Sequence, residues 1–165
     1  MTDPIRLPDL STEKDFTGDK FAPLYTTTVT VDGGAAAHGR ASGRARSSDG
    51  ALDLELRMPA ELGGTGEGTN PEQLFAAGFA ACFHGALSLL ARQESLDPTA
   101  VTVLATVAFV RDPGDGGYLL HVDLVVRWPG VPRTTATSLM ERADALCPYA
   151  RMAWRGTPIT LTLAP

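Results

Sequence analysis

Two cysteines are the side chains of this sequence best suited to redox chemistry. Cys82 lies inside the apolar stretch GTNPEQLFAAGFAACF, and Cys147 lies much later, in CPYA. In a reducing compartment, two distant cysteines are either unrelated core residues or a redox pair. A buried cysteine is usually an inert small hydrophobe, so the neighbouring chemistry must decide between the two interpretations.

A reactive Cys82 would need a cation beside it. The thiolate is the nucleophilic form, and burial in apolar surroundings raises a thiol pKa. The segment around Cys82 offers no cation within one helical turn, whereas the upstream segment HGRASGR contains Arg40 and Arg44. If that segment is extended, both arginines lie on one face, so strand parity does not choose between them. Taken singly, each also fits an ordinary solvated strand residue.

Glu72 is the one acidic residue in the same apolar stretch, ten residues before Cys82. On a straight helix this spacing separates the two by about 15 Å and about 80°. Three arrangements could join them: a bend near Gly78, an arginine that spans the gap, or a second subunit that completes the site. The simpler role for Glu72 is a helix cap, because Glu72 and Gln73 follow Thr69, Asn70 and Pro71, a typical helix start.

Other catalytic chemistries have weaker support. His84 follows Cys82 by two residues, which is about 200° around a helix, so the two are poorly placed as a hydrolase pair. The three histidines are scattered and no CxxC is present, so no metal site is predicted. The glycine-rich loop before residue 70 lacks the Lys-Ser/Thr of a phosphate-binding P-loop.

The overall composition is that of an ordinary globular protein, and we expect no bound cofactor. The chain has 165 residues, 44% hydrophobic residues and a net charge of −5, and its 14 Lys and Arg form no dense basic run, which argues against nucleic-acid binding. Residues 1–22 are polar and predict a flexible tail, followed by one domain over 23–165. No signal-peptide pattern is seen and the longest apolar stretch is interrupted, so we expect a cytoplasmic protein without a membrane span.

Hydrophobic periodicity predicts the element order βββαββαβ. This order indicates an α+β fold in which antiparallel sheets pack around two main helices. The predicted strands are Leu24–Val31, His38–Ser47, Ala51–Met58, Val101–Val110, Tyr118–Trp128 and Ile159–Leu163, and the predicted helices cover 71–92 and Arg133–Leu146.

Several of these motifs together resemble a known family. GTNPEQLFAAGFAACF with the later CPYA, preceded by SSDGALDLELRMP and ELGG, is similar to the organic hydroperoxide resistance (Ohr) branch of the Ohr/OsmC thiol peroxidases. The resemblance covers about residues 24–163. It implies an OsmC-like fold and an intertwined homodimer with sites near the subunit interface, which would resolve the distance between Glu72 and Cys82.

The resemblance also implies roles for particular residues. Cys82 matches the peroxidatic cysteine, which becomes a sulfenic acid, and Cys147 matches the resolving cysteine, which closes a Cys82–Cys147 disulfide. A dihydrolipoyl group on a lipoylated protein would then reduce that disulfide. Glu72 matches the acid that holds the catalytic arginine beside the thiolate. For that arginine we choose Arg40, because HGR aligns best with the family pattern, with Arg44 as the alternative.

Two departures from the family pattern concern the arginine and the second cysteine. GRASG is one residue longer than the GRDG-like turn in which the family arginine usually sits, and CPYA stands where CPYS is common.

The substrate class follows from the residues around Cys82. Phe75, Phe79 and Phe83 predict an apolar pocket that favours alkyl or fatty-acid hydroperoxides over hydrogen peroxide, although each could instead belong to the core. The two rival functions are an OsmC-like peroxidase of broader specificity and a thiol redox sensor without turnover. The absence of a DNA-binding helix pair or a basic patch argues against a sensor on DNA.

Overall fold

The computed structural model describes residues 23–34 and 42–164, and the predicted α+β architecture with antiparallel sheets is confirmed. The predicted tail and Arg40 lie outside the described residues. The described elements are β1 (Val29–Asp32), β2 (Gly43–Ser47), β3 (Asp53–Leu56), a 3-10 turn (Ala60–Leu62), α1 (Pro71–Gln93), β4 (Thr102–Arg111), β5 (Tyr118–Arg127), α2 (Arg133–Leu146) and α3 (Pro148–Arg155).

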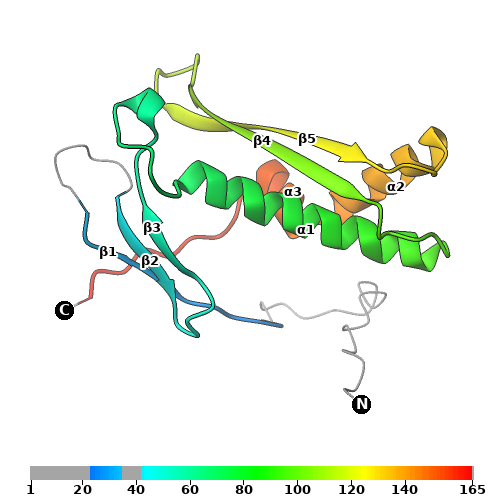
Figure 1. Cartoon of the computed structure of the whole chain (residues 1–165), viewed down its shortest axis with the longest axis horizontal. Helices are drawn as coiled ribbons and strands as arrows, with labels where there is room; N and C mark the ends of the chain where they lie inside the picture. The colour runs from blue at the N-terminus through cyan, green and yellow to red at the C-terminus, as the bar shows by residue number, and fades with distance from the viewer. Residues whose placement is uncertain (1–22, 35–41, 165) are drawn as a thin grey trace.

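The strands form two separate antiparallel sheets. One is a three-stranded meander in the order β1-β2-β3, and the other is the long β4–β5 hairpin, paired from Thr102 opposite Arg127 to Arg111 opposite Tyr118. Figure 1 shows α1 running lengthwise beneath the hairpin, with α2 and α3 behind it and the meander to one side. The predicted DPGDGG turn closes the hairpin, and Gly117 accepts a hydrogen bond from the Asp112 amide.

The start of α1 is fixed by a capping box. The Asn70 side chain accepts a hydrogen bond from the Gln73 amide at 2.9 Å, and the Gln73 side chain accepts one from the Asn70 amide at 3.2 Å. Pro71 occupies the first helical position, where its missing N–H costs nothing. The predicted capping box is therefore confirmed with Asn70 as the cap, and the side chain that reaches back to it is that of Gln73 rather than that of Glu72.

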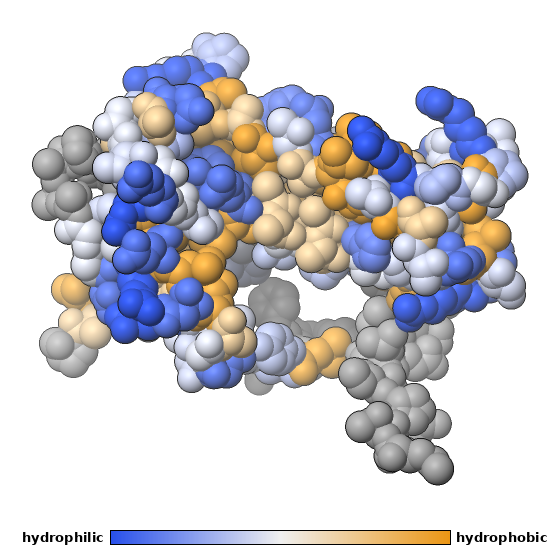
Figure 2. Space-filling view, in the orientation of Figure 1, coloured by the Kyte–Doolittle hydropathy of each residue, from blue (hydrophilic) through white to orange (hydrophobic). Residues whose placement is uncertain are grey.

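Helix α1 forms one side of the hydrophobic core. Its length and hydropathy equal those of a membrane-spanning helix, yet it packs against β4, α2 and α3 as a core helix does. Leu87 and Ala91 on α1 and Ala143 on α2 are completely buried. Figure 2 shows apolar surface over the middle of the molecule with hydrophilic side chains toward both ends.

The predicted final strand, Ile159–Leu163, is wrong for this chain. The segment after α3 forms no strand in the described part of the chain, and Leu161 and Leu163 are 92% and 95% exposed. A strand needs a neighbouring edge to satisfy its backbone groups, and the described residues bring no edge to this segment. A third helix, α3, was not predicted and occupies the stretch just before it.

Candidate functional site

The two cysteines meet where the end of α2 crosses α1. The Cys147 thiol donates a hydrogen bond to the Cys82 sulfur, with the two sulfur atoms 3.1 Å apart. Both thiols are free, Cys147 is completely buried, and Cys82 is half-buried. A disulfide has a sulfur–sulfur length of about 2.05 Å, so an approach of about 1 Å would bring the sulfurs to bonding distance.

Helix α3 begins directly beside this thiol pair. Cys147 ends α2 and also caps α3, whose first residue is Pro148. The Tyr149 amide, the first N–H that α3 can offer, donates a hydrogen bond to the Cys82 sulfur. Hydrogen bonds from backbone amides at a helix start favour an anion, so this contact favours the Cys82 thiolate.

The Tyr149 side chain fixes α3 against α1 one turn before Cys82. Its ring lies 6.0 Å from the Phe75 ring and 5.8 Å from the Phe79 ring, measured between centroids. Its hydroxyl covers Gly78, where an added Cβ would come within 2.8 Å of the oxygen. Glycine at residue 78 therefore permits the close approach that places the start of α3 beside the thiol.

Burial opposes ionisation of the nucleophile. Removal from water raises the pKa of Cys82 to about 11, the neighbouring Cys147 thiol also raises it, and the Tyr149 N–H lowers it. In the described part of the chain these three influences set the pKa, and none of them is a cation. At neutral pH they leave Cys82 protonated, so rapid nucleophilic chemistry requires an additional positive charge.

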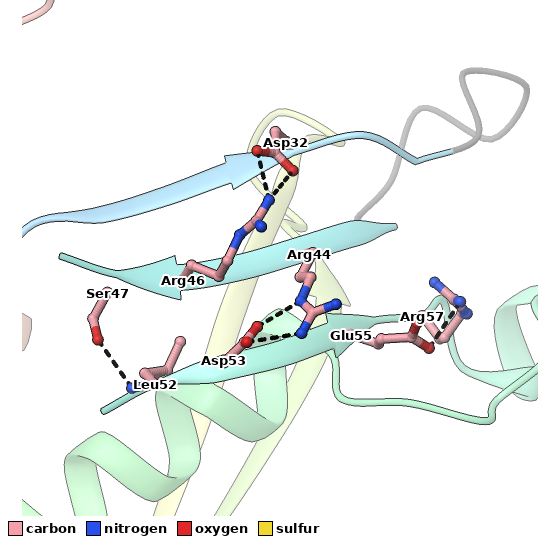
Figure 3. A network of polar contacts seen from close by, with 8 residues as sticks. All are labelled: Asp32, Arg44, Arg46, Ser47, Leu52, Asp53, Glu55 and Arg57. Carbon is pink, nitrogen blue, oxygen red and sulfur yellow. Dashed lines mark hydrogen bonds and ion pairs between the residues drawn. The ribbon is translucent and has the colours of Figure 1, made fainter. Parts of the chain in front are cut away.

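Of the two candidate arginines, the structure describes Arg44. Its guanidinium donates two hydrogen bonds to Asp53, at 2.5 and 2.7 Å, on the exposed face of the meander (Figure 3). This pair raises the pKa of Arg44 and lowers the pKa of Asp53. The neighbouring Arg46 is likewise paired, with Asp32 at 3.0 Å. Arg44 is thus already engaged as an ordinary strand residue.

Glu72 lies in the first turn of α1, and Cys82 lies ten residues later on the same uninterrupted helix. At 1.5 Å per residue the two are about 15 Å apart along the axis. Within one chain the structure therefore does not bring Glu72 and Cys82 together.

A cavity of about 850 Å³ opens beside Cys82, between α1 and α3. Most of its walls are apolar side chains, among them Leu89, Leu146 and Met152. His84 also lines it, and its Nδ1 atom lies 3.4 Å from the Ser88 hydroxyl. This cavity was not predicted, because α3, which forms one of its walls, was not predicted.

The three predicted pocket phenylalanines do not line this cavity. Phe79 and Phe83 are each 4% exposed and belong to the hydrophobic core, whereas Phe75 is half-buried and packs edge-on against Phe79, with ring centroids 5.9 Å apart. Phe75, Phe79 and Cys82 share one side of α1, since they are spaced four and three residues apart. The part of the chain that is described contains no cluster of His, Cys, Asp and Glu fit to hold a metal ion.

This fold and this pair of thiols define the class of protein. The family of OsmC-like proteins matches residues 64–162. An organic hydroperoxide resistance protein of Xanthomonas axonopodis pv. citri is 43% identical over 143 residues, which is 86% of this chain and 95% of that protein. The chain therefore belongs to the OsmC-like family.

Solved structures agree with this assignment. The organic hydroperoxide resistance protein OhrB of Bacillus subtilis is 41% identical, with a TM-score of 0.67 over 81% of this chain and 93% of that one. An organic hydroperoxide resistance protein of Legionella pneumophila is 39% identical, with a TM-score of 0.71 over 82% and 93%. Within the family, the chain thus groups with the organic hydroperoxide resistance proteins, and the predicted resemblance is confirmed.

Proposed function

We propose that this protein is a thiol-dependent peroxidase that reduces organic hydroperoxides to alcohols and so detoxifies them. The observation that carries the proposal is the 3.1 Å separation between the Cys82 and Cys147 sulfur atoms. The names of the relatives support the peroxide-detoxifying role, and the apolar cavity beside Cys82 suits an organic substrate better than hydrogen peroxide.

In the proposed cycle, the Cys82 thiolate attacks the terminal oxygen of the hydroperoxide. The O–O bond breaks, the alkoxide takes up a proton and leaves as the alcohol, and Cys82 becomes a sulfenic acid. Cys147 then attacks the sulfenic sulfur, water leaves, and a disulfide forms. The sulfur separation supports this second step, since little movement is required.

Two further residues and a reductant complete the proposal. Arg40 supplies the positive charge that ionises Cys82 and stabilises charge on the leaving oxygen, and Glu72 holds that arginine. A dihydrolipoyl group on a lipoylated protein reduces the disulfide, since two electrons must enter for each peroxide consumed. The site is completed in a cytoplasmic homodimer, which is supported by the separation of Glu72 from Cys82 and by the exposed apolar Leu161 and Leu163.

The first test is the intact mass of the fully reduced protein after one equivalent of cumene hydroperoxide, with peptide mapping. A loss of two hydrogens that maps to a Cys82–Cys147 bond within one chain is the expected result. An unchanged mass with both thiols free would contradict the proposal. Repeated turnover with a dithiol distinguishes a peroxidase from a redox sensor, and equal rates with hydrogen peroxide would contradict the organic specificity.

A further inference from the structure

Helix α3 is held against the rest of the molecule by its first turn. Figure 1 shows it beside the middle of α1, which it contacts. Of its residues only Ala150 is buried, Tyr149 is half-buried, and Trp154 near the other end is 79% exposed. A helix this short is marginal on its own in water, so its packing contacts decide where it lies. The position of its start therefore depends on Ala150 and Tyr149.

Gly78 is the residue of α1 that the Tyr149 side chain covers. A Cβ added at Gly78 would lie 2.8 Å from the Tyr149 hydroxyl oxygen and 3.2 Å from Cζ of the ring. Glycine is less favourable than alanine inside a helix. A second glycine of α1, Gly85, shows the contrast, because a Cβ added there would meet nothing within 4 Å. Of these two positions, only residue 78 must lack a side chain for Tyr149 to pack as it does.

The start of α3 carries two groups that contact the Cys82 sulfur. The Tyr149 N–H donates a hydrogen bond to that sulfur, and the Cys147 sulfur lies 3.1 Å from it. Cys147 and Tyr149 are separated only by Pro148, whose ring fixes its φ angle, so the two groups move together. A displacement of the start of α3 would therefore weaken the hydrogen bond to Cys82 and separate the two sulfur atoms at the same time.

Other ionisable side chains of the neighbouring elements do not replace this contact. Those that line the cavity beside Cys82 are His84, Arg92, Arg151 and Arg155. The ionisable residues of β4 and α2 are Arg111, Arg133, Glu141, Arg142 and Asp144. None of these is among the described groups that shift the pKa of Cys82, whereas the Tyr149 N–H and the Cys147 thiol are.

We propose that Tyr149 is a positioning residue of the thiol site. Packed on Gly78, it holds its own N–H at the Cys82 sulfur and keeps Cys147 close to that sulfur. This inference rests on the peroxidase function proposed above and adds to it a residue on which both chemical steps depend. In the first step, the N–H stabilises the thiolate that attacks the peroxide oxygen.

The second step depends on the same placement. The Cys147 sulfur bonds to the sulfenic sulfur of Cys82, the S–O bond breaks, and hydroxide leaves as water with the thiol proton of Cys147. Because the two sulfur atoms must approach by about 1 Å to reach the disulfide length, a start of α3 that is displaced by the Tyr149 side chain slows this closure.

The first test measures the ionisation of Cys82 in a Cys147→Ser background of the full-length protein, where it is the only cysteine. Gly78→Ala and the matched control Gly85→Ala each add one Cβ to α1 and gain the same helix propensity. The readout is the thiolate absorbance as a function of pH, rather than turnover, since Gly85 lines the cavity. We expect Gly78→Ala to raise the pKa of Cys82 by about one unit, because a hydrogen bond to a charged acceptor is weakened. The control should leave this pKa unchanged.

Two changes at Tyr149 show whether its side chain is the cause. Tyr149→Phe removes the atom nearest to the added Cβ, so Gly78→Ala/Tyr149→Phe should recover part of the pKa shift. Tyr149→Ala removes the ring, releases the start of α3, and should raise the pKa of Cys82 with Gly78 intact. An unchanged pKa in Gly78→Ala or in Tyr149→Ala overturns the inference. An equal shift in Gly85→Ala, or no recovery in the double variant, overturns it too.

The second test follows the fate of oxidised Cys82 with Cys147 in place. After treatment with increasing cumene hydroperoxide, intact mass separates the disulfide, which has lost two hydrogens, from the sulfinic acid, which has gained two oxygens. Slower closure in Gly78→Ala should lower the peroxide concentration that over-oxidises half of the protein by about tenfold. The same concentration in Gly78→Ala and the wild type overturns the inference. A wild type that forms neither product refutes the peroxidase function itself.

Discussion

Removal of Arg40 should abolish the ionisation of Cys82 at neutral pH. The groups that the structure describes around Cys82 raise its pKa to about 11. At pH 7 such a thiol is thiolate in only about one molecule in 10,000. Cysteines activated by a nearby cation have pKa values of about 3.5–7.5. Arg40→Ala should therefore move the pKa of Cys82 upward, toward the value set by burial.

The expected loss is large enough to measure directly. In a Cys147→Ser background Cys82 is the only remaining cysteine, so alkylation by iodoacetamide and the ultraviolet absorbance of the thiolate report on it alone. We expect Arg40→Ala to slow alkylation at pH 7 by between about 10² and 10⁴-fold. The rate should recover as pH rises through the new pKa, because deprotonation restores the nucleophile.

Arg44→Ala is the matched control for this experiment. Arg44 is bound to Asp53 on the exposed face of the meander, so its loss should leave the pKa of Cys82 unchanged. If Arg44→Ala raises the pKa and Arg40→Ala does not, the choice of catalytic arginine is wrong. If neither variant changes it, the idea that one of these two arginines ionises the thiol is refuted.

Three further predictions concern the second cysteine, the core and the helix start. Cys147→Ser should still consume one equivalent of hydroperoxide but leave Cys82 open to overoxidation, seen as a stepwise gain of oxygen in the intact mass. Leu87→Ala opens a cavity at a completely buried position of α1 and should lower the free energy of unfolding by about 2–5 kcal/mol, measured with urea. Asn70→Ala removes the cap that accepts the Gln73 amide and should cost about 1 kcal/mol in the same assay.

Local sequence patterns predicted correctly those strands and helices whose hydrogen bonds and buried contacts are formed within the described chain itself. The alternation of Leu54 and Leu56 with Asp53 and Glu55 predicted a half-buried strand, and these leucines are the less exposed residues of β3. The helix Arg133–Leu146 was predicted with its observed bounds. In each case the signal and the interaction that stabilises the element lie within a few residues of each other.

Helix α3 was not predicted because a proline can mark either the end of one helix or the start of the next. Pro148 was interpreted as the residue that stops the preceding helix, which it is, yet proline also favours the first position of a new one. The sequence contained a further signal, since Gly156 follows the residues of α3 and ends it with a positive φ of 71°. Recognition of this helix would have placed the Tyr149 amide and the cavity near Cys82.

The C-terminal segment has the sequence pattern of a strand but no partner strand within the described part of the chain. Ile159, Leu161 and Leu163 alternate with threonines as in a strand, but they are 77%, 92% and 95% exposed. Alternation encodes a face that is to be buried, and it does not say against which chain. The exposed alternating residues are consistent with the proposed homodimer, in which a second subunit would supply the missing sheet edge.

The thiol pair itself could not be derived from sequence spacing. Helix geometry fixes where Cys82 points, but the approach of Cys147 depends on how α2 and α3 cross α1, and that crossing is set by contacts such as Tyr149 on Gly78. Family resemblance predicted the pairing, and the structure supplies the distance. For the catalytic arginine, the family resemblance favours Arg40, whereas the structure describes only the alternative, Arg44.

An apolar helix is an unfavourable place for a nucleophile, and this has a mechanistic consequence. The same desolvation that raises the pKa of Cys82 also creates the apolar surroundings that an organic hydroperoxide requires. Apolar surroundings thus favour an organic substrate but disfavour ionisation of the Cys82 thiol. A nearby positive charge is needed to restore the thiolate. Because a charge acts strongly where water is excluded, one well-placed arginine can reverse the effect of burial. In the proposed mechanism Arg40 is that arginine, so we expect the reactivity of Cys82 to depend on Arg40 as much as on the thiol itself.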